Sequence, residues 1–373
     1  MGMNRLLSVC VNVLFFAIPV FAQQNNTADS LTGKSKIFSM GLRGQYSYLW
    51  LHSQDIAPIG QAYPWGLQAE FNWHLVGEKA WQQCNCYPRT GLIISWFNFD
   101  NPKVLGHGFS GVYYIEPYFT HDRKVNFSLR GAAGFSYLTR PYDSLTNPLN
   151  YSYSMPLGGF LMIHLAMNYR FSKRTNLSLS ANINHISNGG IREPNKGINF
   201  PSASIGIDYS LQDAVFIKRE RRSFVPKAGK KYRKDFFVFA SSKVIMHGEK
   251  KRHLIYGMGF SISREISKLN ALNAGAEWKQ DFALKEKLYR EGITQISNHR
   301  MGILLGHEFL MGRFSLSQQL GIYIYDPSHY NDAVYQRYGL QYRIGKLFLI
   351  GINVKAHRQV ADFLDFRLGI DFL

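Results

Sequence analysis

The amino-acid sequence predicts an all-β protein whose transmembrane antiparallel strands close into β-barrels. Hydrophobic residues make up 46% of its 373 residues and aromatic residues 15%. Beyond the N-terminal segment, however, no stretch reaches the roughly 18 consecutive apolar residues of a membrane-spanning helix. The apolar residues instead alternate with polar ones, which gives each strand one apolar and one polar face. The chain also ends on such a segment, Leu364 to Phe372, which a soluble β-sandwich would not need. Together these observations favour a membrane barrel over a sandwich.

The N-terminal segment is typical of a secretory signal peptide. Arg5 precedes an apolar run from Leu6 to Phe21, which is followed by the small residue Ala22. We therefore expect residues 1–22 to be cleaved during export. In an exported protein, the formal net charge of +18 points to anionic lipid head groups as partners, and not to nucleic acid.

Sixteen alternating segments of about ten residues or more follow, separated by turn residues, as expected for tilted strands that cross a bilayer. The first eight are residues 36–48, 63–75, 89–99, 104–119, 124–138, 156–171, 175–187 and 199–211. The second eight are residues 235–246, 253–265, 270–282, 298–310, 313–325, 333–344, 347–357 and 362–373. Eight strands can close a small barrel and sixteen a porin-sized one. The sequence therefore leaves two eight-stranded barrels and one 16-stranded barrel as alternatives.

A basic segment separates the two sets of strands. Residues 218–234 hold nine Lys or Arg residues around Pro226 and Gly229, a composition typical of a solvated connector. The sequence thus predicts four parts: a signal peptide (1–22), a first barrel unit (23–215), a basic linker (216–234) and a second barrel unit (235–373).

The expected topology places one end of the 175–187 strand at the outer rim of the first barrel. With both ends of that barrel in the periplasm and strands alternating in direction, this strand runs outward. The longer connections 49–62, 139–154 and 188–198 then also lie outside, whereas the long 76–88 connection is an exception on the periplasmic side.

Candidate chemistry lies at this outer end. His185 and Ser187 share the apolar face of their strand, because side chains two residues apart point the same way. That face also carries Leu177, Leu179, Ala181 and Ile183, and the opposite face carries Ser178, Ser180, Asn182 and Asn184. A serine becomes an effective nucleophile when a neighbouring base takes its proton and a third group orients the base. We expect Ser187 to be the nucleophile, His185 the base and Asn199, on the apolar face of the next strand, the third group.

The loop after Ser187 offers an alternative third group and candidate oxyanion donors. Glu193 is a carboxylate that could fold back toward His185 in place of Asn199. An ester hydrolase also needs donors aimed at the developing oxyanion. The residues close enough in sequence to serve in this way, or to support the loop, are Asn188, Gly189, Gly190 and Asn195.

These residues resemble the active-site region of a known family. His185-Ile186-Ser187-Asn188-Gly189, followed by the segment from Pro194 to Asn199, is similar to the site of the lipid A 3-O-deacylases, which are eight-stranded outer-membrane barrels. The resemblance implies that His185 is the base and Ser187 the nucleophile in releasing an ester-linked acyl chain from lipid A. The family has a glutamate where this chain has Asn199. An amide can orient the imidazole but cannot offset its charge as a carboxylate can.

The same segment also resembles outer-membrane phospholipase A. That family shares the His-x-Ser-Asn-Gly start and has an asparagine at the spacing of Asn199 from Ser187. The resemblance implies hydrolysis of glycerophospholipids, assisted by calcium. Apart from calcium in that case, we expect no metal or other cofactor.

The leading expectation is a serine acyl-ester hydrolase in the outer membrane of a Gram-negative bacterium. Its partner would be lipid A of lipopolysaccharide in the outer leaflet, and the sequence predicts no oligomeric state. The alternatives are a phospholipase and a structural or porin barrel whose hydrolase site has decayed. The second unit is expected to be non-catalytic, because His357 shares its face with Gly351, Asn353 and Lys355 and no serine occupies the matching place.

Overall fold

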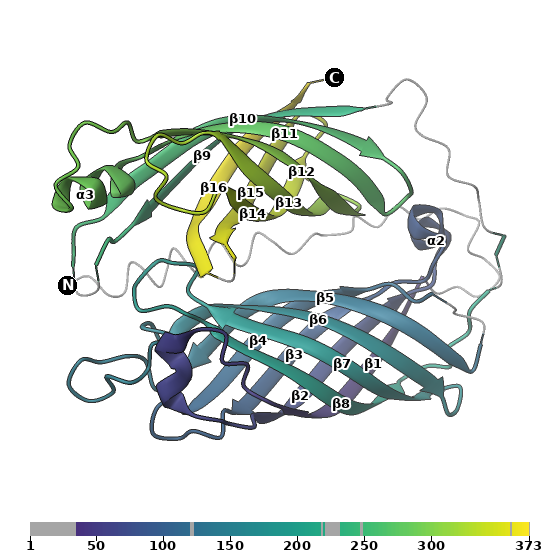
Figure 1. Cartoon of the computed structure of the whole chain (residues 1–373). Coiled ribbons are helices and arrows are strands. Elements are labelled where there is room, and N and C mark those ends of the chain that lie inside the picture. Colours follow the sequence, from purple (N-terminus) through teal and green to yellow (C-terminus); the bar gives the residue numbers. More distant parts are fainter. Residues whose placement is uncertain are drawn as a thin grey trace, which may run out of the picture. The chain divides into compact units, whose positions relative to one another are not determined.

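The computed structural model describes residues 35–119, 123–217, 219–220, 232–246, 249–358 and 360–372. These residues form two closed antiparallel β-barrels, each of eight strands (Figure 1). The expected signal peptide, residues 1–22, lies outside the described residues, as does most of the expected basic linker. Within the described ranges, no helix has both the length and the apolar character needed to cross a membrane.

The first barrel closes where its last strand pairs with its first. Its strands are β1 (Lys36–Ser47), β2 (Trp65–Leu75), β3 (Arg89–Asn98), β4 (His107–Glu116), β5 (Val125–Leu138), β6 (Leu157–Arg170), β7 (Thr175–Ser187) and β8 (Ile198–Ser210). Each strand pairs with the next, and the register Leu42↔Ile207 joins β1 to β8.

The second barrel closes in the same way, through pairing of β16 with β9. Its strands are β9 (Arg233–Lys243), β10 (His253–Glu265), β11 (Asn270–Asp281), β12 (His299–Met311), β13 (Phe314–Tyr325), β14 (Val334–Ile344), β15 (Phe348–His357) and β16 (Val360–Phe372). All sixteen strands were predicted, with ends that differ by at most three residues. Of the two alternatives for their closure, the structure has two eight-stranded barrels.

In the described connections, three short helices were not predicted. They are the 3-10 helix η1 (Gln54–Ile59), α2 (Glu78–Cys84) and α3 (Phe282–Arg290). Helix α2 accounts for the long 76–88 connection that did not fit the expected topology, and a disulfide joins Cys84 to Cys86 at its end. Each helix is shorter than the segments in which apolar periodicity can be recognised.

The two faces of the strands have opposite character, as the alternation predicts. In β7, Leu179 is 55% exposed and Ile183 is 56% exposed. The residue that follows each of them, Ser180 and Asn184, is buried. Apolar side chains therefore face outward and polar side chains face the interior of the barrel. This is the pattern of a barrel surrounded by lipid.

Paired charges fill the middle of the first barrel. Arg130 Nη1 lies 2.8 Å from Glu70 Oε1, and its Nη2 lies 3.0 Å from Glu116 Oε2. Arg89 joins Glu116 to Asp208, with 2.8 Å between Arg89 Nη1 and Asp208 Oδ2. Buried charges are tolerated when they are paired and hydrogen-bonded in this way. The network ties β2, β3, β4, β5 and β8 to one another.

An apolar layer fills the barrel at the end where β7 finishes. Ile186 and Ile198 lie opposite each other on β7 and β8 and are fully buried. They belong to one cluster with Phe97, Phe160 and Phe200, in which the Phe97 and Phe200 ring centroids are 5.3 Å apart. The inward neighbours of the candidate catalytic residues are therefore firmly packed.

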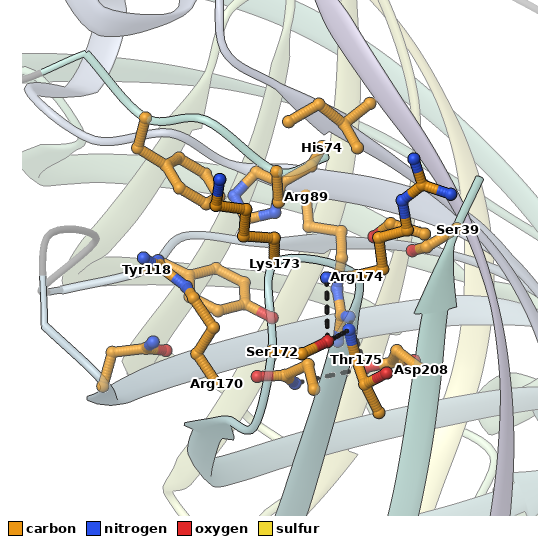
Figure 2. A pocket seen from close by; sticks show the side chains of 16 residues that line it. Ser39, His74, Arg89, Tyr118, Arg170, Ser172, Lys173, Arg174, Thr175 and Asp208 are labelled. Carbon is orange, nitrogen blue, oxygen red and sulfur yellow. Dashed lines mark hydrogen bonds and ion pairs between the residues drawn. The ribbon is translucent and has the colours of Figure 1, made fainter. Parts of the chain in front are cut away.

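The opposite end of the first barrel is partly covered by the residues that follow β8. Ala214 and Phe216 pack against a cluster that contains Trp81 and Tyr87. Phe216, expected to begin the solvated linker, also lies under the Arg170 guanidinium. Figure 2 shows the small pocket at this end, which is lined by Arg89, His74, Lys173, Arg174 and Asp208 among others. Because Thr175, at the start of β7, also lines it, the pocket lies at the other end of that strand from His185 and Ser187.

The charge network makes a testable prediction for stability. Replacing Arg130 with Met leaves Glu70 paired with Arg43 and Glu116 paired with Arg89. Removing one partner of a fully isolated buried pair costs about 3–5 kcal/mol, so the loss here should be a part of that, on the order of 1–3 kcal/mol. We expect urea titrations in detergent micelles, followed by tryptophan fluorescence, to show this loss for Arg130→Met. Arg123→Met, at an exposed position, should unfold at the wild-type urea concentration. Equal midpoints for the two variants would show that the network does not stabilise the barrel.

Candidate active site

The pairing of β7 with β8 brings three candidate residues together on the outer face of the first barrel. His185 lies directly opposite Asn199 in the register of the two strands. Ser187 follows His185 on the same face, and all three side chains are partly buried. The positions inferred from alternation are therefore adjacent in space.

These side chains form a continuous hydrogen-bonded chain. His185 Nδ1 lies 2.6 Å from Asn199 Oδ1, and His185 Nε2 lies 2.9 Å from Ser187 Oγ. An amide oxygen can only accept a hydrogen bond, so Nδ1 carries the proton of the neutral ring. Nε2 is then left with a lone pair directed at the Ser187 hydroxyl. This is the arrangement that a general base requires.

Glu193, the alternative third member, contacts another part of the loop. Its Oε2 accepts a hydrogen bond of 3.0 Å from the backbone N–H of Asn195. The partner of His185 Nδ1 is the Asn199 amide. Glu193 thus shapes the loop between β7 and β8.

The loop donors proposed for the oxyanion divide into two groups. Asn188 Oδ1 accepts from the N–H groups of Gly190 and Ile191, at 3.0 and 3.1 Å, and the Asn188 N–H donates to Asn195 Oδ1 at 2.9 Å. These contacts fold the loop after Ser187. In the part of the chain that the structure describes, the N–H of Gly189 and the Nδ2 of Asn195 have no hydrogen-bond acceptor. Among the candidate oxyanion donors, these two are therefore the ones whose N–H groups are unpaired in the described residues.

Two glycines leave room around the site. Gly197 has a φ of +78°, and a Cβ there would lie 2.9 Å from His185 Cε1, so a larger residue would displace the imidazole. Gly159 on β6 pairs with Ser187 and lies on the outer face beside it. Its neighbour Leu161, opposite His185, is 52% exposed. The serine is thus bordered by a small residue and by apolar surface.

A further histidine completes the hydrogen-bonded chain and was not predicted. His52, in the connection after β1, has its Nδ1 3.0 Å from Asn199 Nδ2. Closure of the barrel brings it there, because β8 pairs with β7 on one side and with β1 on the other. The sequence gives no sign of this contact, since His52 lies outside any alternating segment.

The second barrel arranges its corresponding histidine differently. His357 Nδ1 lies 3.8 Å from Asp362 Oδ2, and its Nε2 lies 3.4 Å from the Tyr323 hydroxyl. This histidine thus contacts an acid and a phenol, and neither contact is with a serine. Among the described residues, no group of three His, Cys, Asp or Glu side chains is placed to hold a metal ion.

Comparison with known proteins identifies the family. The family model described as lipid A 3-O-deacylase (PagL) matches residues 65–208, which include His185, Ser187 and Asn199. The model described as acyloxyacyl hydrolase, C-terminal domain, matches residues 232–373. None of the curated proteins compared with the chain matches it.

Several solved structures of outer-membrane barrels are similar at low sequence identity. Neisserial surface protein A is 10% identical, with a TM-score of 0.33, over 46% of this chain and 96% of its own. A mutant of the Rh. blastica porin is 11% identical, with a TM-score of 0.21, over 90% of this chain and 100% of its own. The family assignment comes from the two family models, which together cover most of the sequence. The chain belongs to the lipid A 3-O-deacylase family.

Proposed function

We propose that this protein is a serine esterase that removes an ester-linked acyl chain from lipid A. The observation that carries the proposal is the hydrogen-bonded chain Ser187–His185–Asn199 on the outward, apolar face of a barrel. In a soluble enzyme this face would meet water. On a membrane barrel it meets the acyl chains of lipids, so the nucleophile lies next to its substrate.

The proposed reaction follows the general chemistry of serine hydrolases. Ser187 Oγ attacks the ester carbonyl carbon while His185 Nε2 takes the hydroxyl proton. The carbonyl oxygen becomes an oxyanion, for which the Gly189 N–H and Asn195 Nδ2 are the available donors. As the ester C–O bond breaks, His185 gives the proton to the leaving sugar oxygen, and an acyl-serine remains. Water, deprotonated by the same imidazole, attacks the acyl-serine, and the imidazolium returns this proton to Ser187 Oγ as the fatty acid is released.

Asn199 takes the third role through orientation and not through charge. Its Oδ1 holds the His185 proton on Nδ1, which keeps Nε2 basic. A third group that imposes the wrong tautomer can cost about 10⁴ in rate, whereas natural Cys-His-Asn sites are active. We therefore infer that Asn199 supports catalysis as long as its oxygen faces His185.

Two features support a location in the outer leaflet of an outer membrane. The apolar exterior of the strands suits a lipid surrounding, and lipid A deacylation implies a membrane that contains lipopolysaccharide. The site also lies at the end of the barrel from which the long connections 139–156 and 188–197 extend. Long connections of such barrels are typically extracellular.

The first test is mass spectrometry of lipid A from a Gram-negative host that expresses the protein. We expect lipid A that lacks one ester-linked acyl chain. Ser187→Ala removes the nucleophile and should lower the rate by more than about 10³-fold, which leaves lipid A unchanged. Ser144→Ala, at an exposed loop position, is the matched control and should behave as wild type.

Other outcomes of this experiment would point to the alternatives. Unchanged lipid A with calcium-dependent release of fatty acid from phosphatidylethanolamine would favour a phospholipase. Unchanged lipid and phospholipid, with the protein folded in the membrane, would favour a structural barrel and contradict the proposal.

A second prediction concerns the approach of the substrate. Replacing Gly159 with Leu places a branched side chain beside Ser187 on the outer face, where the acyl group has to reach the hydroxyl. We expect kcat/KM for lipid A to fall by about 100-fold, the size of effect that a small misplacement of substrate produces.

Gly159→Ala is the matched control for this prediction. A Cβ at this position meets its nearest atom, the Ser187 carbonyl oxygen, at 3.6 Å, which is an ordinary contact. This variant should therefore keep near wild-type activity. Wild-type kcat/KM in Gly159→Leu would show that the substrate does not approach across β6.

A further inference from the structure

The amide of Asn199 raises a problem that a carboxylate does not have. A glutamate presents an acceptor oxygen to the imidazole whichever way it is turned. An amide presents either an oxygen or an NH2 group, and only the oxygen can accept from His185 Nδ1. A flipped Asn199 would stabilise the tautomer in which Nε2 carries the proton and cannot receive one from Ser187.

The hydrogen bonds of His52 can favour one of these two orientations of the Asn199 amide. Its Nδ1 is 3.0 Å from Asn199 Nδ2, and its Nε2 is 2.9 Å from the carbonyl oxygen of Lys196. A carbonyl oxygen only accepts, so the neutral ring places its proton on Nε2 and leaves a lone pair on Nδ1. That lone pair accepts from the Asn199 NH2 group, which turns Oδ1 toward His185.

The opposite tautomer of His52 fits its surroundings less well. With the proton on Nδ1, the ring could donate to the Trp50 carbonyl oxygen, which lies 3.1 Å away. The lone pair on Nε2 would then face the Lys196 carbonyl oxygen, and a donor would face the Asn199 NH2 group. Both contacts are repulsive, and they are only partly offset by the longer bond of 3.4 Å that Nε2 could then accept from Asn199 Nδ2. In the other tautomer a single contact is repulsive, that between the Nδ1 lone pair and the Trp50 carbonyl oxygen. The tautomer that accepts from Asn199 at 3.0 Å and donates to Lys196 at 2.9 Å is therefore favoured.

The backbone holds His52 and its partners in place. The Trp50 N–H donates to the Asn199 carbonyl at 2.9 Å, which continues the pairing of β1 with β8 beyond the end of the strand. On the other side, the Lys196 N–H donates to the Tyr151 carbonyl at 3.0 Å, and its ammonium pairs with Asp55 at 2.8 Å. His52 therefore lies between two segments that are held by hydrogen bonds, and it contacts the Asn199 side chain from there.

We propose that His52 is a positioning residue that fixes the orientation of the Asn199 amide and, through it, the tautomer of His185. The hydrogen-bonded chain then runs from His52 through Asn199 and His185 to Ser187. This inference rests on the proposed function, because it assigns His52 a role in that same site. It also explains how an amide can stand where the family has a glutamate.

A double-mutant cycle tests the proposal through activity. His52→Phe cannot accept from Asn199 and should lower kcat by about 10- to 100-fold, as the loss of a supporting hydrogen-bond partner commonly does. His52→Gln keeps an acceptor and a donor, so it should retain most of the activity. In an Asn199→Glu background there is no amide for His52 to orient, so adding His52→Phe should change kcat by less than about three-fold. If His52 acted independently of residue 199, the effects of the two substitutions would add.

The result that overturns the proposal is an equal loss on His52→Phe in both backgrounds. Such a loss would mean that His52 only anchors the loop. Failure of His52→Gln to restore activity, with the barrel folded, would also contradict it.

A spectroscopic measurement tests the same proposal without turnover. Nitrogen-15 NMR of histidine-labelled protein in detergent micelles reports which ring nitrogen carries the proton. Comparison with His52→Gln and His185→Gln assigns two of the 12 histidines. We expect the proton of His52 on Nε2 and that of His185 on Nδ1, and His52→Phe should shift His185 toward the other tautomer.

The two readouts separate this proposal from the proposed function. A His52 proton on Nδ1, or an unchanged His185 in His52→Phe, would overturn the positioning role even in an active enzyme. An inactive wild-type protein with the expected tautomers would instead overturn the deacylase proposal and leave the positioning of Asn199 supported.

Discussion

The site depends on the register between β7 and β8. His185 lies opposite Asn199 in this register, which places an acceptor oxygen 2.6 Å from the imidazole Nδ1 on the outer face. Because side chains alternate along a strand, a slip of one residue would turn Asn199 into the barrel interior. The geometry of the candidate base is therefore set by backbone pairing.

Packing inside the barrel maintains this register. Ile186 and Ile198 pair on the inner face directly behind the site, and they lie in the apolar layer with Phe200. Farther along the interior, Arg130 and Glu116 belong to the network of buried charges that joins strands around the ring. A slipped strand would expose this apolar layer and separate these charges. The packing of the inner face thus fixes the positions of the candidate catalytic residues on the outer face.

Alternation made most of the fold predictable from the sequence. It located all sixteen strands and placed His185, Ser187 and Asn199 on one apolar face, because both conclusions need only the local period of two. The contact with His52 could not be predicted in this way, since it depends on β1 closing against β8. The number of rings also depends on pairing between distant strands. Likewise, the packing of Phe216 on the barrel end depends on contacts with Trp81 and Tyr87 and not on local composition.

The central claim is that a reactive serine faces lipid, activated by the histidine beside it. A long-chain alkyl fluorophosphonate that partitions into bilayers tests this claim most directly, because it reacts with activated serines. With the protein reconstituted in phospholipid vesicles, peptide mass spectrometry should find one adduct, on Ser187, and His185→Ala should abolish it. Modification elsewhere with Ser187 intact, or equal labelling of Ser187 in His185→Ala, would contradict the account.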